Sequence, residues 1–141
     1  MAASRKATPS YIFDGKLIRV IDGDTAVIMV ERTATAEVDF GFHIITRVFV
    51  RDSAEIHFRL NGINAADNED VKAKKAATAA LRELLADKPL RVTSLGPDKY
   101  GDRWQAIVDV DDGAGGWLNI NKEMVRLGKA KAWSGAGKRP V

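Results

Sequence analysis

The sequence predicts a mainly β fold with helices, and within that class a small closed barrel of the five-stranded oligonucleotide/oligosaccharide-binding (OB) type. Two observations lead to this prediction. Several short runs that are rich in β-branched and aromatic residues, or that alternate between apolar and polar residues, follow one another along the chain. One long helical segment interrupts them late and a short one follows the last strand, which gives the order β-β-β-β-α-β-β-α. A parallel βαβ sheet would instead need a helix between most of its strands.

The first predicted hairpin joins two apolar runs, Leu17–Ile21 and Ala26–Val30. Between them, Asp22 and Asp24 flank Gly23, which is expected to supply the positive φ of a tight reversal. The two carboxylates should therefore lie at or beside the tip of the hairpin. Carboxylates on a rigid turn are either solvated turn residues or ligands of a hard cation such as Ca²⁺ or Mg²⁺, and this stretch alone leaves both interpretations open.

The next strands are predicted on either side of a turn at Asp52–Ser53. Glu31–Glu37 is polar and rich in threonine, so we expect a loop or a frayed hairpin end there. Phe42–Arg51 is rich in β-branched and aromatic residues, which favours a strand. Ala54–Asn61 alternates strictly, so its apolar residues share one face and Arg59 lies on the polar face.

A long helix is predicted from Asn68 to Ala86, with Asn68 as its N-cap. Pro89 follows its end, as is common after a helix. Apolar residues at helical spacing should form its inward side. These residues are Ala77, Leu81, Leu84 and Leu85.

Two further strands and a short helix complete the predicted domain. Leu90–Leu95 is the first strand, and Arg103–Val110 alternates again with Trp104 on the inward side. The short helix, Asn119–Leu127, is expected to end at Gly128. Its predicted inward residues are Ile120, Met124 and Leu127.

Length and composition indicate one domain, because 141 residues suffice to bury a proper core. We expect the domain at residues 11–133, between flexible tails at 1–10 and 134–141. No apolar run is long enough to span a membrane and none follows the basic residues near the N-terminus, so we expect a cytoplasmic protein without membrane contact. The absence of cysteine excludes disulfides, thiolate zinc sites and cysteine nucleophiles.

The net charge of +3 does not by itself indicate a nucleic-acid-binding surface. Four basic residues lie in the two tails and every acidic residue lies between them, so residues 11–133 carry a net charge of −1. Any phosphate-binding surface must therefore depend on individual arginines.

Three segments of the chain resemble the signature segments of the staphylococcal (micrococcal) nuclease family. They are Val20-Ile-Asp-Gly-Asp-Thr25, Phe58-Arg-Leu-Asn-Gly-Ile-Asn-Ala-Ala-Asp67 and Asp98-Lys-Tyr-Gly-Asp-Arg103. Leu118-Asn119 and Met124-Val-Arg-Leu-Gly128 resemble the helix that follows in that family. The segments occur in the family's order and cover most of residues 16–133. The stretch Asp39–His43 and the ending from Trp133 resemble phage-encoded members of the family. A phage-encoded protein would be located in the host cytoplasm or in a virion.

The resemblance implies an OB-fold phosphodiesterase that uses Ca²⁺ and acts on DNA, RNA or both. Its implied metal ligands are Asp24, Asn64 and the backbone carbonyl of Ala65. Asp67 corresponds to the general base, and Arg59 and Arg103 correspond to the two arginines that clamp the scissile phosphate. The implied substrate-binding residues are Lys99 and Tyr100, at positions that contact a terminal phosphate, and Trp133, near the position of an aromatic residue that stacks on the base.

These residue types suit phosphodiester hydrolysis. The reaction concentrates negative charge on a pentacoordinate phosphorus, which a cation and bidentate guanidinium donors stabilise. A carboxylate within about 3 Å of a water molecule can orient or deprotonate it to form the nucleophile.

The chain departs from the family's pattern within one loop. Asn64 stands in place of an aspartate and brings no charge, which generally weakens Ca²⁺ binding. Ala65 replaces a threonine, and Asp67 replaces a glutamate with a side chain one methylene shorter. These changes leave a second interpretation open, in which the protein is a catalytically weak or inactive module that binds nucleic acid or serves as a phage structural protein. Contacts with a phage particle or with a second copy of the chain are also open.

Overall fold

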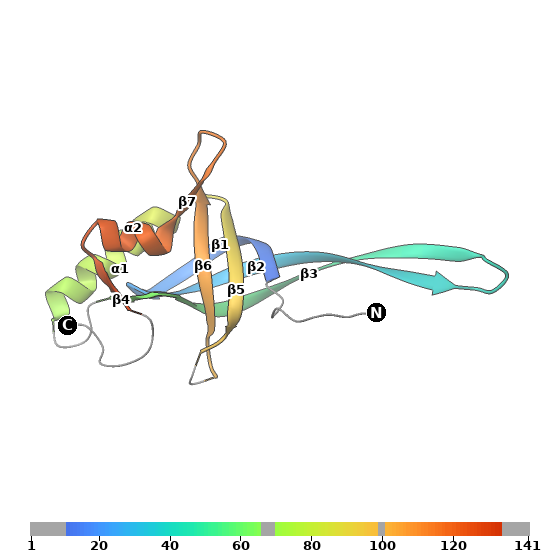
Figure 1. The fold of residues 1–141 in the computed structure, drawn as a ribbon, viewed down its shortest axis with the longest axis horizontal. Helices are drawn as coiled ribbons and strands as arrows, with labels where there is room; N and C mark the ends of the chain where they lie inside the picture. The colour runs from blue at the N-terminus through green and yellow to red at the C-terminus, as the bar shows by residue number, and fades with distance from the viewer. Residues whose placement is uncertain (1–10, 66–69, 99–100, 134–141) are drawn as a thin grey trace.

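The computed structural model describes residues 11–65, 70–98 and 101–133, and this part of the chain is mainly β with two helices (Figure 1). The predicted tails at 1–10 and 134–141 lie outside the described residues. No helix in the described ranges is long and apolar enough to cross a membrane. The elements in chain order are β1 (Tyr11–Asp22), β2 (Thr25–Asp39), β3 (Ile45–Leu60), β4 (Ile63–Ala65), α1 (Val71–Leu85), β5 (Leu90–Pro97), β6 (Trp104–Asp111), β7 (Trp117–Asn119), α2 (Ile120–Arg126) and β8 (Ala130–Ala132).

The main sheet has six strands in the order β3-β2-β1-β5-β6-β7, and each neighbouring pair in this order is antiparallel. A further, parallel pairing joins Phe58–Leu60 of β3 to Trp104–Ala106 of β6. The strands β1, β2, β3, β6 and β5 therefore each pair with two others of the same five. This pairing brings the end of β3, which carries Arg59, beside the start of β6. A separate two-stranded sheet pairs β4 with β8.

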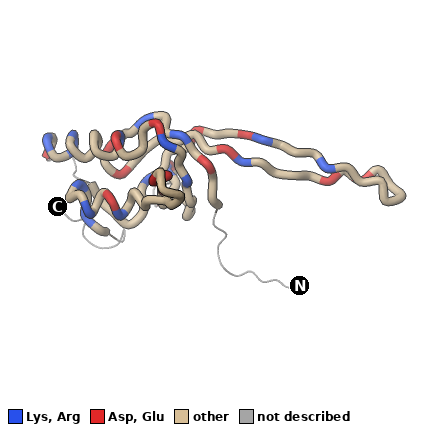
Figure 2. The backbone as a smooth tube through the Cα atoms, turned by 90° about the horizontal axis from the view of Figure 1, so that it is seen from above, with Lys and Arg blue, Asp and Glu red and all other residues tan. Residues whose placement is uncertain are grey.

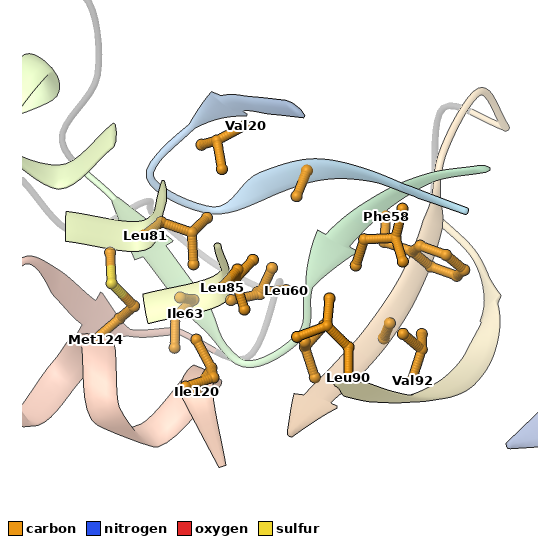
Figure 3. Packing of buried hydrophobic residues seen from close by; sticks show 14 of the residues in the cluster. Val20, Phe58, Leu60, Ile63, Leu81, Leu85, Leu90, Val92, Ile120 and Met124 are labelled. Carbon is orange, nitrogen blue, oxygen red and sulfur yellow. The ribbon is translucent and has the colours of Figure 1, made fainter. Parts of the chain in front are cut away.

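Both helices pack on the strands around one apolar core (Figure 3). The predicted inward residues of α1 are confirmed: Ala77, Leu81 and Leu85 are buried and Leu84 packs against the core. Ile120 and Met124 of α2 are buried as well. The prediction for Leu127 is wrong, because this residue is the C-cap of α2 and is 41% exposed.

The prediction that Trp104 lies in the core is also wrong, since its side chain is 44% exposed. Trp104 is the first residue of β6, and the buried residues of this strand begin two positions later at Ala106. Alternation correctly separated the two faces of β6, but it does not say how far along a strand the core extends.

Strands β2 and β3 are much longer than predicted and form a hairpin that projects from the rest of the molecule (Figure 1). Glu31–Glu37 is part of β2 rather than a loop, and Asp52–Ser53 lies inside β3 rather than in a turn. The charged residues that suggested a loop make ion pairs across the hairpin, which stabilise adjacent strands. Arg51 pairs with Glu31 (Nη2 to Oε2, 2.6 Å) and Arg47 with Glu37 (Nε to Oε1, 3.4 Å).

The helix ends are held by side-chain caps. Asp70 is the N-cap of α1, and its Oδ1 accepts a hydrogen bond from the Ala73 backbone N–H at 3.0 Å. The predicted cap, Asn68, lies outside the described residues. Asn119 caps α2 in the same way, and Gly128 follows the helix with a φ of +74°, as predicted for a helix end.

Gly23 is required for close packing rather than for a positive φ. The hairpin is present, since Asp22 pairs with Thr25 across a two-residue connection, but Gly23 does not adopt a positive φ. A Cβ added at Gly23 would lie 2.6 Å from the Cβ of Ala77 in α1 and 2.7 Å from the Cβ of Ala65 in β4. The turn can therefore approach both elements only because these three residues are so small, and this approach places Asp24 beside β4.

We expect Gly23→Ala to lower the free energy of unfolding by about 1–3 kcal/mol, because the new methyl group overlaps two neighbours in a packed region. Urea denaturation of the two proteins measures the difference. The cost should be smaller in an Ala77→Gly background, which removes one of the two contacts. An unchanged midpoint in Gly23→Ala would contradict the close approach.

Candidate functional site

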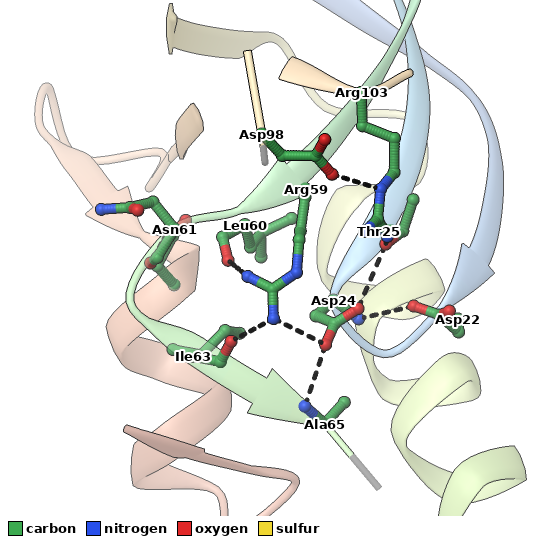
Figure 4. A network of polar contacts seen from close by, with 11 residues as sticks. Asp22, Asp24, Thr25, Arg59, Leu60, Asn61, Ile63, Ala65, Asp98 and Arg103 are labelled. Carbon is green, nitrogen blue, oxygen red and sulfur yellow. Dashed lines mark hydrogen bonds and ion pairs between the residues drawn. The ribbon is translucent and has the colours of Figure 1, made fainter. Parts of the chain in front are cut away.

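The carboxylate of Asp24 is buried where the β1–β2 connection meets β4 (Figure 4). Its Oδ2 accepts a hydrogen bond from the Ala65 backbone N–H at 3.1 Å, and its Oδ1 accepts one from the Thr25 hydroxyl at 3.1 Å. A buried carboxylate needs such partners, because an ionised group loses its hydration when it leaves water. Asp24 is therefore a buried and hydrogen-bonded carboxylate, and not a solvated turn residue.

Arg59 is held beside Asp24 by main-chain carbonyls. Its Nη2 lies 3.7 Å from Oδ2 of Asp24 and donates to the Ile63 carbonyl at 3.0 Å, while Nη1 donates to the Leu60 carbonyl at 3.3 Å. Only 11% of the side chain is exposed, and the guanidinium lies over the Trp133 ring with 5.6 Å from Cζ to the ring centroid. The group is oriented before any ligand arrives, and a guanidinium has five donors in a fixed plane.

Arg103 joins the same network through Thr25. Its Nη1 donates to the Thr25 hydroxyl oxygen at 3.2 Å, and that hydroxyl donates to Asp24. Its Nε donates to Oδ2 of Asp98 at 2.8 Å, and the Asp98 carboxylate also accepts from the Gly101 backbone N–H. The side chain of Arg103 is 26% exposed, so it is the more accessible of the two arginines.

Asn64 and Ala65 form the end of β4, where β8 fixes the backbone. Asn64 pairs in register with Lys131 and Ala65 with Ala130, and both β4 residues are buried. The Trp133 backbone N–H donates to the Gly62 carbonyl at 2.8 Å, which holds the residue after β8 against the residue before β4. The structure therefore brings Asp24, Arg59, Ala65 and Trp133 together directly, places Asn64 next to Ala65, and links Arg103 through Thr25.

Asp22 is the second carboxylate of the turn, and its Oδ1 accepts a hydrogen bond from the Asp24 backbone N–H at 3.1 Å. Burial first, and then the neighbouring Asp24 side chain, raises the pKa of Asp22 to about 6. At pH 7 the Asp22 carboxyl is thus mostly ionised, about one pH unit above its pKa. Asp22 is not among the ligands that the resemblance implies, and its hydrogen bond with the Asp24 backbone N–H stabilises the turn.

Three predicted site residues, Asp67, Lys99 and Tyr100, lie outside the described residues, so their roles stay predictions. Two residues of the network were not singled out from the sequence. Asp98 stands in a quoted motif, but its role depends on the turn that brings it back to Arg103. Thr25 ends the first motif, and its role as a bridge depends on Arg103, which is 78 positions further along the chain.

The residues that could hold a metal supply hard oxygen donors. Among the described residues no three histidine or acidic side chains come together, so a cage of several carboxylates is not present there. The predicted set offers one carboxylate from Asp24, one amide oxygen from Asn64 and one backbone carbonyl from Ala65. Oxygen donors of this kind suit Ca²⁺, which takes 6–8 of them and would fill its other positions with water or substrate. A single carboxylate predicts modest affinity.

Comparison with models of known protein families gives no match. The chain is similar to two curated proteins of Escherichia coli, one of them from O157:H7, and each is called an uncharacterized endonuclease. In both cases the identity is 28% over 127 residues, which cover 90% of this chain and 65% of the relative. The chain thus spans just under two thirds of the length of these relatives.

The network predicts that Asp98 is essential for holding Arg103, whereas its neighbour Asp102 is not. Asp98→Asn should lower the free energy of unfolding by about 1.5–3 kcal/mol, because it breaks a charge-assisted hydrogen bond whose acceptor side chain is only 4% exposed. Asp102→Asn is a matched control, since its carboxylate is 75% exposed and 3.8 Å from the same Nε. This variant should stay within about 0.5 kcal/mol of the parent protein in urea denaturation. Equal costs would contradict the assignment.

Proposed function

We propose that this protein is a Ca²⁺-dependent nuclease that hydrolyses phosphodiester bonds of DNA, RNA or both. The observation that carries the proposal is the single polar network in which Asp24 contacts Arg59 directly and Arg103 through Thr25. The similarity to proteins called endonucleases supports the same class of activity. The resemblance of the three sequence segments to staphylococcal nuclease-like proteins, with phage-encoded members among them, supports the finer assignment.

The strand pairing supports an OB-type barrel as the framework of this activity. Five strands each pair with two others, and the parallel β3–β6 pair joins the two ends of the run β3-β2-β1-β5-β6. The single long helix lies in sequence between β3 and β5, as in the predicted order. In such a barrel the end of β3 and the start of β6 lie next to each other, which is where both arginines stand.

In the proposed mechanism the arginines bind the scissile phosphate and stabilise the charge that develops on it. Arg59 is already oriented by the Ile63 and Leu60 carbonyls, so little reorganisation is needed when the phosphate binds. Arg103 is oriented by Asp98 and Thr25. Trp133, which lies under the Arg59 guanidinium, offers a face on which a base can stack.

Asp24, Asn64 and the Ala65 carbonyl would hold the Ca²⁺. When bound, the ion supplies positive charge beside the phosphate and a coordination position for water. Asp67 would orient or deprotonate the attacking water, and Lys99 and Tyr100 would contact the substrate outside the scissile phosphate. These three residues belong to the proposal on the strength of their sequence positions.

We expect purified protein to cut single-stranded DNA or RNA in Ca²⁺ and not in chelator. Arg59→Ala should lower the rate about 10²–10³-fold, because it removes a preorganised donor from the developing charge. Arg91→Ala is a matched control: Arg91 also pairs with an aspartate (Nη2 to Oδ2 of Asp109, 3.5 Å) and lies over a tryptophan ring (Trp117, 4.6 Å). It should change the rate less than about threefold.

Chelator-insensitive binding of nucleic acid without cleavage would instead favour the non-catalytic module. The same outcome would remove Arg59 and Arg103 from any catalytic role.

Ca²⁺ should raise the unfolding temperature of the parent protein, because a ligand that binds only the folded state stabilises it. Asp24→Asn should lose this shift and the cleavage activity, while it keeps the size of the side chain and one oxygen acceptor. Thermal unfolding with Ca²⁺ and with chelator makes the comparison. A shift of the same size in Asp24→Asn would show that the ion binds elsewhere.

If Asp67 is the general base with a shortened side chain, Asp67→Glu should keep or raise turnover and Asp67→Ala should abolish it. Initial rates of cleavage at saturating Ca²⁺ measure both. Normal cleavage by Asp67→Ala would remove Asp67 from the mechanism.

A further inference from the structure

Residues 31–53 form an arm, the part of the β2–β3 hairpin that extends beyond the body of the protein (Figure 1). Beyond Glu31, which also pairs with Asp14 of β1, each strand of the arm pairs only with the other. Every residue of the arm except Gly41 is exposed, so neither face of this two-stranded ribbon is covered by another element. A two-stranded hairpin by itself is only marginally stable in water. The arm is thus a long two-stranded hairpin that lacks packing contacts to stabilise it.

The two faces of the arm differ strongly in character. Residues directly opposite each other in an antiparallel pair point to the same side, so the register assigns every side chain to a face. One face, here called the polar face, carries the Glu31–Arg51 and Glu37–Arg47 ion pairs and two threonines, with Phe49 and Ile45 as apolar exceptions. The other face is here called the apolar face. It lies on the same side of β2 as the core residues Ile28 and Val30, and it extends beyond them into solvent. Its residues beyond the Arg32–Asp52 pair are Ala34, Ala36, Val38, Thr46, Val48 and Val50.

The apolar face and the tip are exposed to a degree that is unusual for a soluble monomer. Val38, Val48 and Val50 are 40%, 46% and 52% exposed, and the turn residues Phe40 and Phe42 are 67% and 98% exposed. The turn also holds Phe42 at a positive φ of 55°, an uncommon conformation for a bulky residue. Within the described chain, Tyr11 of β1 lies against this side of the ribbon only at its base, at Arg32.

Charge restricts what can cover the apolar face. Within the arm, four acidic residues outnumber three basic ones, and no Lys, Arg, Asp or Glu lies between Phe40 and Thr46 (Figure 2). A nucleic acid or an anionic lipid surface would require a basic arm. The fitting occupant is therefore an uncharged apolar surface that is similarly narrow.

We propose that this occupant is the arm of a second copy of the chain, packed apolar face against apolar face about a twofold axis. An isologous interface needs a surface that complements itself, and a strip composed mostly of alanine and valine does. An axis at the Ala36–Val48 pair lies four positions from Phe40 and four from Arg32. It therefore places the tip of each arm over the base of the other, where the Tyr11 ring, 45% exposed, covers Arg32 with 4.8 Å from Cζ to the ring centroid.

The surface is of the size that a dimer requires. A standard interface buries about 800 Å² per partner. Phe40 and Phe42, which are 67% and 98% exposed, together expose roughly 330 Å², taking about 200 Å² for a whole aromatic side chain. The half-exposed aliphatic residues of the apolar face and the exposed Tyr11 at the base of the arm extend the area toward that value.

Sedimentation equilibrium tests the dimer. The parent protein should be dimeric at micromolar concentration. Val48→Glu should weaken the dimer at least about 100-fold, because each interface buries two unpaired carboxylates. Thr35→Glu is the matched control, since it adds the same charge on the polar face, one register position from the Ala36–Val48 pair, and should leave the dimer unchanged. Far-UV circular dichroism confirms that the variants keep their strands.

Cross-linking tests the arrangement of the arms, and the absence of native cysteine makes the readout specific. A short bismaleimide should join two copies of Ala36→Cys, which lies at the proposed axis, and should not join copies of Thr35→Cys on the polar face. A parent protein that stays monomeric up to about 200 μM, well above a micromolar Kd, overturns the proposal. Equal cross-linking of both variants overturns it too, and so does binding of the monomer to lipid vesicles through the arm. None of these outcomes depends on nuclease activity.

Discussion

The burial of the Asp24 carboxylate is the constraint on which the rest of the site depends. An ionised carboxylate in the interior is tolerated only when hydrogen bonds and a counter-charge replace water. Here the replacements come from three directions: the Ala65 backbone N–H, the Thr25 hydroxyl and the Arg59 guanidinium. The first hairpin, the end of β3 and β4 therefore cannot separate without leaving a buried charge unpaired.

The two arginines are held by different means, and this gives them different properties. Arg59 is oriented by the Leu60 and Ile63 carbonyls, is only 11% exposed, and shares its charge with Asp24 across 3.7 Å. Arg103 is oriented by the Asp98 carboxylate, which fixes its direction but also offsets part of its positive charge. An anion that binds both would meet a buried donor beside Asp24 and a more exposed donor beside Asp98.

Much of this arrangement could be predicted from local patterns, because those patterns decide which face a side chain occupies. The alternation of Ala54–Asn61 placed Arg59, and the Asp22–Gly23–Asp24 turn placed Asp24 at a hairpin. Contacts between distant segments could not be predicted in this way. The charges of Glu31 and Glu37 suggested a loop until the register paired them with arginines about 10 to 20 residues away. The need for glycine at position 23 likewise depends on close contact with α1 and β4. The role of Asp98 depends on its hydrogen bond with Arg103.

The parallel pairing of β3 with β6 also has a consequence for how the molecule forms. It joins residues 58–60 to residues 104–106, with the whole of α1 and β5 in between. Contacts across such a long stretch are slow to form, because the entropy of closing the intervening chain is lost before the contact stabilises anything. A polypeptide still emerging from the ribosome would hold Asp24 and Arg59 well before Arg103 existed to join them. The complete network therefore arises only at the end of folding, so a partly synthesised chain cannot carry it.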